Sequence, residues 1–336
     1  MRATHAGGEW AAEASLCLAL DFGGTKLAAG LVEWRAGRVL RQARCSTHER
    51  VGAAGQIADM ERLVQELALS DAEWPVLWGV GVSFGGPVDA ASGRVLHSHH
   101  VDGWDDLLLA ARLEETYGRP VVVENDANAV ALGEYRYGAG RGVEDLVYIT
   151  VSTGIGGGVV LGGRLWRGSH GVAGEVGHMV VRPGGPLCTC GNRGCLEALA
   201  SGPSIARRAR EALEAGAPGE RLLALAGGDP LAITAELVFR AVRAGDAAAA
   251  AAVAGAAEDL GLGIAMLSSI VDPARVILGG GVAKAGEQLL VPVRQAFRRY
   301  AFPMLAGRVE IVQAAALDEG GLLGAAALVA QAASAP

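Results

Sequence analysis

The 336-residue chain has no run of eighteen consecutive apolar residues, and its opening segment lacks the apolar core of a signal peptide. That segment, residues 1–14, carries one Arg and two acidic residues, Glu9 and Glu13. We therefore expect no membrane partner and a cytoplasmic location. The segment itself is expected to be a disordered end or a mis-assigned start, and no function is assigned to it.

Excess positive charge is also missing. The chain has 29 Lys and Arg residues against 36 Asp and Glu residues, which gives a net charge of −7 and a pI near 5.6. This balance offers no electrostatic reason to bind nucleic acid or an anionic membrane. Small molecules are therefore the expected partners.

A disulfide framework is absent as well, because the five cysteines are odd in number and three of them crowd together. His178, Cys188, Cys190 and Cys195 form the pattern H-x9-C-x-C-x4-C. Three thiolates and an imidazole are the soft ligands of a closed, tetrahedral structural zinc site. The alternatives are buried free thiols with a core histidine, or a redox pair, which the single-residue gap of C-x-C disfavours.

The composition favours a packed enzyme of more than one domain. Apolar residues make up 51% and charged residues 19% of a chain that is too long for one ordinary core. Fifty glycines cluster at the ends of strand-like runs, where they indicate backbone that another group approaches closely.

Apolar runs alternate with helix-like stretches, which predicts a layered α/β architecture. A strand, a glycine-rich turn and a second strand occur twice, around Asp21–Lys26 (DFGGTK) and around Ser152–Gly158 (STGIGGG). This is a weak signal of internal duplication. Further helices are predicted over residues 57–69, 104–117, 204–226, 234–244, 247–270 and after 320, with strands over 76–82, 120–124 and 275–278.

Both glycine turns carry threonine, so they offer backbone N–H groups and hydroxyls of the kind that cradle phosphate oxygens. Either turn alone is equally typical of a tight hairpin without a ligand. Neither matches the phosphate loop G-x-x-x-x-G-K-[ST] or a G-x-G-x-x-G sequence opening a helix, which disfavours P-loop and Rossmann folds.

Acidic residues stand at three further places. Asn125 and Asp126 follow the strand VVVEN and begin a helical stretch, so Asp126 is either a helix cap or a general base for phosphoryl transfer. Glu175 and Glu197 flank the predicted zinc ligands. Each is either a solvated surface residue or an acceptor for sugar hydroxyls.

Six segments, taken in order, resemble the ROK family, a group of bacterial sugar kinases and sugar-responsive repressors with the actin-like ATPase fold. The similarity spans nearly the whole chain. The segments are DFGGTK (Asp21–Lys26), ENDANA (Glu124–Ala129), TGIGGG (Thr153–Gly158), GVAGEVGH (Gly171–His178), CTCGNRGCLE (Cys188–Glu197) and VDPARVILGGG (Val271–Gly281).

The resemblance implies specific roles. Asp126 is the catalytic base. The sugar is contacted by Gly86, Asn125, Asp126, Glu175, His178 and Glu197. The phosphates of ATP and their magnesium are held by Asp21, Gly23, Gly24, Thr25, Lys26, Thr153 and Gly154, and the adenosine is approached by Gly279, Gly280 and Gly281. Zinc, ligated by His178, Cys188, Cys190 and Cys195, holds the sugar loop in register.

The resemblance also implies two α/β domains with ATP between them, the first formed by residues 1–126 plus about 319–336 and the second by 127–318. Sugar binding is expected to close them over the reacting hydroxyl. A homodimer or homotetramer is expected. The reaction implied is phosphorylation of a hexose, with glucose first.

Two departures from the family pattern, in segments that flank the sugar pocket of the family, keep other sugars open. The segment usually written G-x-P-G-P-V-D appears as Val82–Asp89 (VSFGGPVD), and the segment N-L-P-G-W appears as His100–Trp104 (HVDGW). In the second phosphate turn, Ser152 stands where glucokinases commonly have glycine, which need not prevent phosphate binding. N-acetylmannosamine, N-acetylglucosamine, fructose and allose are the alternatives, because discrimination rests on a few buried hydrogen bonds.

Two alternatives belong to other classes. A repressor of this family carries a DNA-binding domain ahead of the kinase-like body, and the twenty residues before Asp21 are expected to leave no room for one. A sugar sensor without turnover is expected to have lost the base or the phosphate turns, and this chain keeps both.

Overall fold

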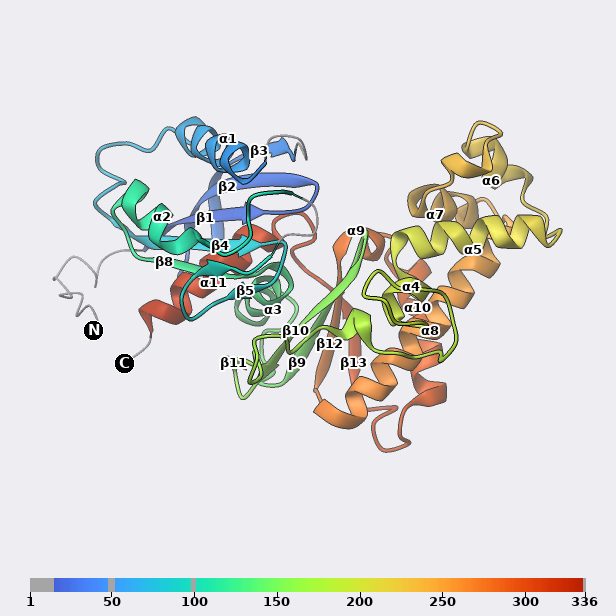
Figure 1. Ribbon diagram of the computed structural model, residues 1–336. Helices are drawn as coiled ribbons and strands as arrows, with labels where there is room; N and C mark the ends of the chain where they lie inside the picture. Colours follow the sequence, from blue (N-terminus) through green and yellow to red (C-terminus); the bar gives the residue numbers. More distant parts are fainter. Residues whose placement is uncertain (1–14, 48–51, 98–100, 335–336) are drawn as a thin grey trace. The chain divides into compact units, whose positions relative to one another are not determined.

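The structure, a computed structural model, describes residues 15–47, 52–97 and 101–334 (Figure 1). Predictions made above for residues 1–14 and for His100 lie outside these ranges. The chain divides into two compact units. Unit 1 holds Met1–Arg141, Arg167–Val172 and Asp318–Pro336, and unit 2 holds Gly142–Trp166 and Ala173–Leu317.

Unit 1 is built on a five-stranded mixed sheet with the order β3-β2-β1-β4-β8. The first three strands form an antiparallel meander, and β1 also pairs in parallel with β4. The strands are β1 (Leu16–Phe22), β2 (Lys26–Glu33), β3 (Arg38–Ser46), β4 (Leu77–Phe84) and β8 (Val121–Asn125). The helices are α1 (Gly52–Glu66), α2 (Leu109–Tyr117), α3 (Asp126–Tyr137) and α11 (Gly320–Ala333).

Alternate residues of β1 serve the two faces of this sheet, as the strand period requires. Leu18 and Leu20 pack in one apolar cluster with side chains of α1 and α2. On the other face small residues admit α11 closely, since a Cβ on Gly81 would collide with the Ala325 carbonyl oxygen. The Asp21 side chain lies on the face opposite to Leu18 and Leu20 and therefore points toward α11.

A small antiparallel sheet follows β4 in the same unit. It consists of β5 (Val88–Asp89), β6 (Arg94–Val95) and β7 (Leu107–Leu108).

Unit 2 repeats the plan of unit 1. Its sheet has the order β11-β10-β9-β12-β13, in which β9 pairs antiparallel with β10 and parallel with β12. The predicted duplication is therefore present as two sheets of like topology. The strands are β9 (Leu146–Val151), β10 (Ile155–Leu161), β11 (Arg164–Leu165), β12 (Arg275–Gly279) and β13 (Glu310–Gln313).

The helices of unit 2 include several short ones. They are η3 (Val176–His178), α4 (Leu196–Ala200), α5 (Gly202–Glu214), α6 (Glu220–Leu225), η4 (Pro230–Ala232), α7 (Ala235–Arg243), α8 (Ala247–Val271), α9 (Gly280–Ala283) and α10 (Glu287–Tyr300).

The longest helix, α8, forms the centre of the helical layer. By length and composition it is apolar enough to cross a membrane, but 61% of its apolar window is buried inside the protein. It also carries Asp259, which is fully buried and forms ion pairs with Arg182 and Arg208. Both properties are those of a core helix in a globular unit.

One helix prediction is wrong, and one helix was not predicted. The helix predicted over 204–226 is divided into α5 and α6, because Gly216 adopts a positive φ of 86° and Pro218 follows it. The sequence analysis also overlooked α10, whose interior contains Pro292. Its buried residues nevertheless recur at helical spacing, which was the signal available.

The predicted domain boundary differs from the division in the structure. Residues 127–141 and 167–172 were predicted to lie in the second domain, but they belong to unit 1. For α3 the reason is close packing on α11, since a Cβ on Gly133 would lie 2.9 Å from the Gly324 nitrogen. The 167–172 segment is held by an ion pair described below.

Candidate active site

The first glycine turn joins β1 to β2 in unit 1. The Gly23 N–H donates to the Lys26 carbonyl at 3.1 Å, and Gly24 and Thr25 at the tip are exposed. Thr47 braces the turn by donating from its hydroxyl to the Gly23 carbonyl at 3.0 Å. The tip is thus rigid while its outward groups are open to a ligand.

Asp21 lies just before this turn. Its carboxylate accepts from the Ser83 hydroxyl at 2.9 Å and lies so close to Gly321, at the start of α11, that a Cβ there would collide with it. Burial raises the pKa of Asp21 above its ordinary value, although the Ser83 hydroxyl and the Lys26 ammonium oppose the shift. A carboxylate held in this way is well suited to interact with a cation.

Asn125 is the N-cap residue of α3, and Asp126 Oδ1 also accepts from the Ala127 N–H, at 2.8 Å. The Asn125 side-chain oxygen accepts from the backbone N–H groups of Ala127 at 3.0 Å and Asn128 at 3.2 Å. Its amide nitrogen donates to Asp126 Oδ1 at 3.2 Å and to the Gly86 carbonyl at 3.2 Å. Asp126 therefore stands in the first turn of the helix with its carboxylate oriented by its neighbour.

Gly85 lies where Asp126 and the first glycine turn converge. A Cβ on Gly85 would lie 3.7 Å from Asp126 Oδ2 and 3.4 Å from the Gly24 nitrogen. Glycine at this position leaves space beside both groups. The departure from the family pattern at Gly85-Gly86 is therefore located next to Asp126.

Trp104 belongs to the second departing segment and is only 1% exposed. Its ring packs edge-on against Phe84 at 4.8 Å and Phe22 at 5.4 Å between centroids, and its indole N–H donates to Gln56 at 2.8 Å. The tryptophan is thus a core residue behind the Gly85–Gly86 backbone.

The second glycine turn joins β9 to β10 in unit 2. Glu197 contacts it directly, because the Ile155 N–H donates to Glu197 Oε2 at 3.0 Å. A Cβ on Gly154 would lie 2.5 Å from the same oxygen. Only glycine leaves this carboxylate its place, which gives Gly154 a structural requirement besides the predicted phosphate contact.

The segment that leads to His178 lies against β10 with unusually close backbone packing. A Cβ on Gly157 would lie 2.9 Å from the Gly174 carbonyl oxygen, and one on Gly174 would lie 2.5 Å from the Gly157 carbonyl oxygen. Gly174 also has a positive φ of 96°. These glycines fix the approach of Glu175 and His178.

The four predicted zinc ligands come together in unit 2, with their ligand atoms all within 4.8 Å of one another. The Cys188 sulfur lies 3.7 Å from His178 Nδ1, and the sulfurs of Cys190 and Cys195 are 3.7 Å apart. Four ligands about 2.3 Å from a central ion in tetrahedral geometry are about 3.8 Å apart, so the residues fit zinc. The last two sulfurs are too far apart for a disulfide.

The thiols differ in their surroundings. The backbone N–H of Asn192 and the neighbouring thiols lower the pKa of exposed Cys190 to about 7, whereas burial raises that of Cys195 to about 12. With Nδ1 of His178 on the thiol side, its Nε2 lies 3.9 Å from Glu175 Oε2. His178 thus has one nitrogen for a metal and the other directed toward a carboxylate.

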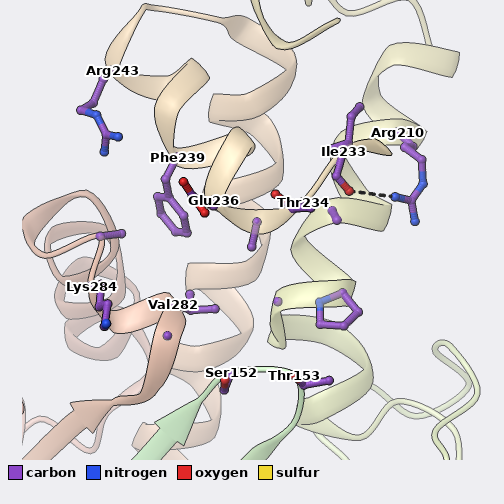
Figure 2. A pocket seen from close by; sticks show the side chains of 16 residues that line it. Ser152, Thr153, Arg210, Ile233, Thr234, Glu236, Phe239, Arg243, Val282 and Lys284 are labelled. Atoms are coloured by element: carbon purple, nitrogen blue, oxygen red, sulfur yellow. Dashed lines mark hydrogen bonds between the residues drawn. The ribbon is translucent and has the colours of Figure 1, made fainter. Parts of the chain in front are cut away.

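A pocket of about 850 Å³ opens beside the second turn within unit 2 (Figure 2). Ser152 and Thr153 form one wall, and Glu236 and Phe239 of α7 project from the opposite one. Arginine and lysine side chains complete the rim; they are Arg210, Arg243 and Lys284. A hydroxyl-lined turn, an aromatic ring and nearby cations suit a nucleoside with a phosphate chain.

Of the three predicted adenosine glycines, only Gly281 lines this pocket. Gly279 is required because a Cβ there would collide with the Tyr148 hydroxyl. Gly280 has a positive φ of 81°, and a Cβ there would lie 2.5 Å from the Val151 carbonyl oxygen. The first two glycines therefore serve packing of α9 on β9.

Residues 17–332 match the sequence model of the ROK family. This chain belongs to the ROK family. It is 36% identical to a glucokinase of Thermotoga maritima, over 93% of this chain and 96% of that protein. It is also 36% identical to an N-acetylmannosamine kinase of Escherichia fergusonii, over 93% and 97%.

A solved structure of a ROK glucokinase from Streptomyces griseus, in complex with glucose and AMPPNP, resembles this chain with a TM-score of 0.82 and 38% sequence identity. The likeness covers 94% of this chain and 99% of that one. The fold is accordingly the actin-like ATPase fold of ROK proteins, and its two like sheets are the duplicated halves of that fold.

Within this ROK protein each unit gathers part of the predicted site. Unit 1 brings Asp126, Asn125 and Gly86 beside the first turn, and unit 2 joins the zinc ligands and Glu197 to the second. The sequence analysis missed the pocket residues of α5 and α7. Their helices offered no motif, so only the folded chain reveals them.

Proposed function

We propose that this ROK protein transfers the γ-phosphoryl group of ATP to glucose, producing glucose 6-phosphate. Relatives named glucokinase, at 36% identity or above over more than nine-tenths of the chain, support a sugar kinase. The observation in the structure that carries the proposal is the position of Asp126. Asn125 is the N-cap residue of α3, and Asp126 Oδ2 lies 3.7 Å from where a Cβ on Gly85 would stand, beside the first glycine turn.

Asp126 accepts the proton of the sugar hydroxyl as that oxygen attacks the γ-phosphorus and the bond to the β-phosphate oxygen breaks. Asn125 orients the carboxylate through its amide nitrogen. Glu175 and Glu197 accept hydrogen bonds from the sugar hydroxyls, and His178 donates one to them.

The nucleotide is bound by both glycine turns and by the pocket beside Thr153. Thr25, Lys26, Thr153 and backbone N–H groups contact the phosphates, and Phe239 lies at the nucleoside end. Magnesium, when bound, would neutralise phosphate charge, and the half-buried carboxylate of Asp21 would help to hold it.

The Cys3His cluster holds a structural zinc ion in this proposal. All four positions are protein ligands, so the ion supplies geometry to the sugar loop rather than chemistry. Zinc thiolates of this kind persist in reducing compartments, which supports a cytoplasmic location for the protein in this proposal. The proposal also includes assembly of this chain into a homodimer or homotetramer.

Release of ADP measured with ATP and magnesium across a sugar panel tests the function. The panel is glucose, mannose, fructose, allose, N-acetylmannosamine and N-acetylglucosamine. Glucose should give the highest kcat/KM, and Asp126→Asn should abolish turnover while Asp71→Asn, an exposed carboxylate in the same unit, leaves it unchanged. Sugar binding by the native chain without turnover of any sugar in the panel would overturn the kinase and favour a sensor.

N-acetylmannosamine is the second candidate substrate. The relative from Escherichia fergusonii and the departure at Gly85-Gly86, beside Asp126, favour it over the remaining sugars. A higher kcat/KM for this sugar than for glucose would replace the leading substrate and leave the reaction class intact.

A further inference from the structure

Glu124 is a buried carboxylate that the proposed mechanism does not use. It is the residue before the Asn125–Asp126 pair, at the end of β8, and only 2% of it is exposed. A carboxylate this deep needs compensating partners. Its partners connect it to the start of α3, the helix that begins at Asp126.

Three groups donate to Glu124. Its Oε1 accepts from the backbone N–H of Asn125 at 3.0 Å and from the Asn128 amide at 3.1 Å. Its Oε2 forms an ion pair with Arg167 Nε at 2.6 Å. One carboxylate therefore contacts the residues on both sides of Asp126 and a distant arginine.

Arg167 opens the short segment Arg167–Val172, which packs with unit 1 although the chain on both sides of it belongs to unit 2. After this segment the chain continues to Glu175 and His178, the predicted sugar contacts. The ion pair thus connects the stretch that leads to Glu175 and His178 with the strand that ends one residue before Asp126.

We infer that Glu124 and Arg167 are positioning residues for Asp126. Neither is assigned a contact with sugar, nucleotide or metal, and both act through the Asn125 backbone and the first turn of α3. The ion pair restrains the backbone at Asn125, whose side chain in turn holds the Asp126 carboxylate. This inference rests on the proposed role of Asp126 as the base.

Removing one partner should affect phosphoryl transfer more than nucleotide binding. Arg167→Gln leaves a buried carboxylate without its cation, so β8 and the start of α3 must shift or recruit water. A displacement of about 1 Å at a catalytic group can lower a rate by about 100-fold. The pocket beside Thr153 belongs to unit 2, and its residues make none of these contacts.

The test compares Arg167→Gln, Glu124→Gln, the double variant and Arg167→Lys. In each single Gln variant kcat should fall by about 10- to 100-fold while KM for ATP changes less than about twofold. The double variant, in which two neutral amides face one another, should regain part of kcat, and Arg167→Lys should retain more than Arg167→Gln. Arg41→Gln, which breaks the Arg41–Glu73 pair in the same unit, is the matched control and should keep kcat.

A second readout requires no enzymatic activity. Hydrogen exchange at the Ala127 and Asn128 amides, both capped by Asn125, should accelerate in Arg167→Gln and not in Arg41→Gln. Unchanged exchange with kcat within twofold of native would overturn the inference. Accelerated exchange in a chain that phosphorylates no sugar would sustain the ion pair's role and refute the proposed function instead.

Discussion

Glu197 joins the predicted zinc loop to the second glycine turn. Its Oε2 accepts the Ile155 N–H at 3.0 Å, and its Oε1 lies 3.3 Å from the Thr189 hydroxyl within the loop of cysteines. Glu197, which is proposed to contact the sugar, therefore also holds the second glycine turn, which is proposed to bind ATP. Sugar and nucleotide binding are expected to be coupled through this side chain.

Gly154→Ala tests this contact between Glu197 and the turn. The new methyl would lie 2.5 Å from Glu197 Oε2, so either the carboxylate or the turn must shift. We expect kcat/KM for ATP to fall by about tenfold or more, because misplacement of phosphate-binding groups is costly. Steady-state kinetics measures it. Gly307→Ala is the control, since a Cβ there meets nothing within 4 Å, and equal losses in both variants would refute the role of this contact.

Cys195→Ser should remove the zinc. Cys195 is fully buried among the other ligands, and the structure of this loop depends on their common contact. Elemental analysis should find one zinc per native chain and almost none in the variant, with an unfolding temperature lower by about 5 °C or more. Cys45→Ser, outside the cluster, should retain both. A native chain without zinc, equally stable after chelation, would contradict the assignment.

Asp259→Ala should destabilise unit 2. The change leaves Arg182 and Arg208 without the buried carboxylate that joins them. Loss of one partner of a buried ion pair costs about 3–5 kcal/mol of unfolding free energy. Glu310→Ala, which breaks the more exposed pair with Arg275, should cost no more than about 1 kcal/mol. Urea denaturation of both variants compares them, and similar small losses would count against the buried network.

Asp21→Asn should increase stability while it abolishes activity. Because burial raises the pKa of Asp21 above its ordinary value of 3.8, the folded chain holds this proton to higher pH than the unfolded chain. Stability is therefore lost as the pH rises from about 3.8 through the folded pKa. The neutral amide avoids that loss.

Urea denaturation at several pH values between 4 and 8 measures this effect. The advantage of Asp21→Asn should grow with pH and then level off above the folded pKa. A variant that is less stable than the native chain at pH 7 would show that the ionised carboxylate stabilises the fold.

The sequence by itself determined the family, the alternating architecture and most of the groups that carry chemistry. Short-range patterns were sufficient for these predictions. The glycine turns indicate hairpins because few other residues fit such turns. His178 and the three cysteines lie within eighteen residues, so one loop brings them together. The carboxylates were identified for the same reason, by their place at the end of a strand or beside a ligand.

Only the tertiary structure decided which groups such a residue contacts. Sequence left Asp126 as either cap or base; in the structure Asn125 is the N-cap residue of α3, and Asp126 shares the Ala127 N–H with it. The pocket walls of α5 and α7 and the Glu124–Arg167 pair depend on contacts between residues far apart in the chain. Such contacts follow from how helices and strands pack, and no local spacing encodes them.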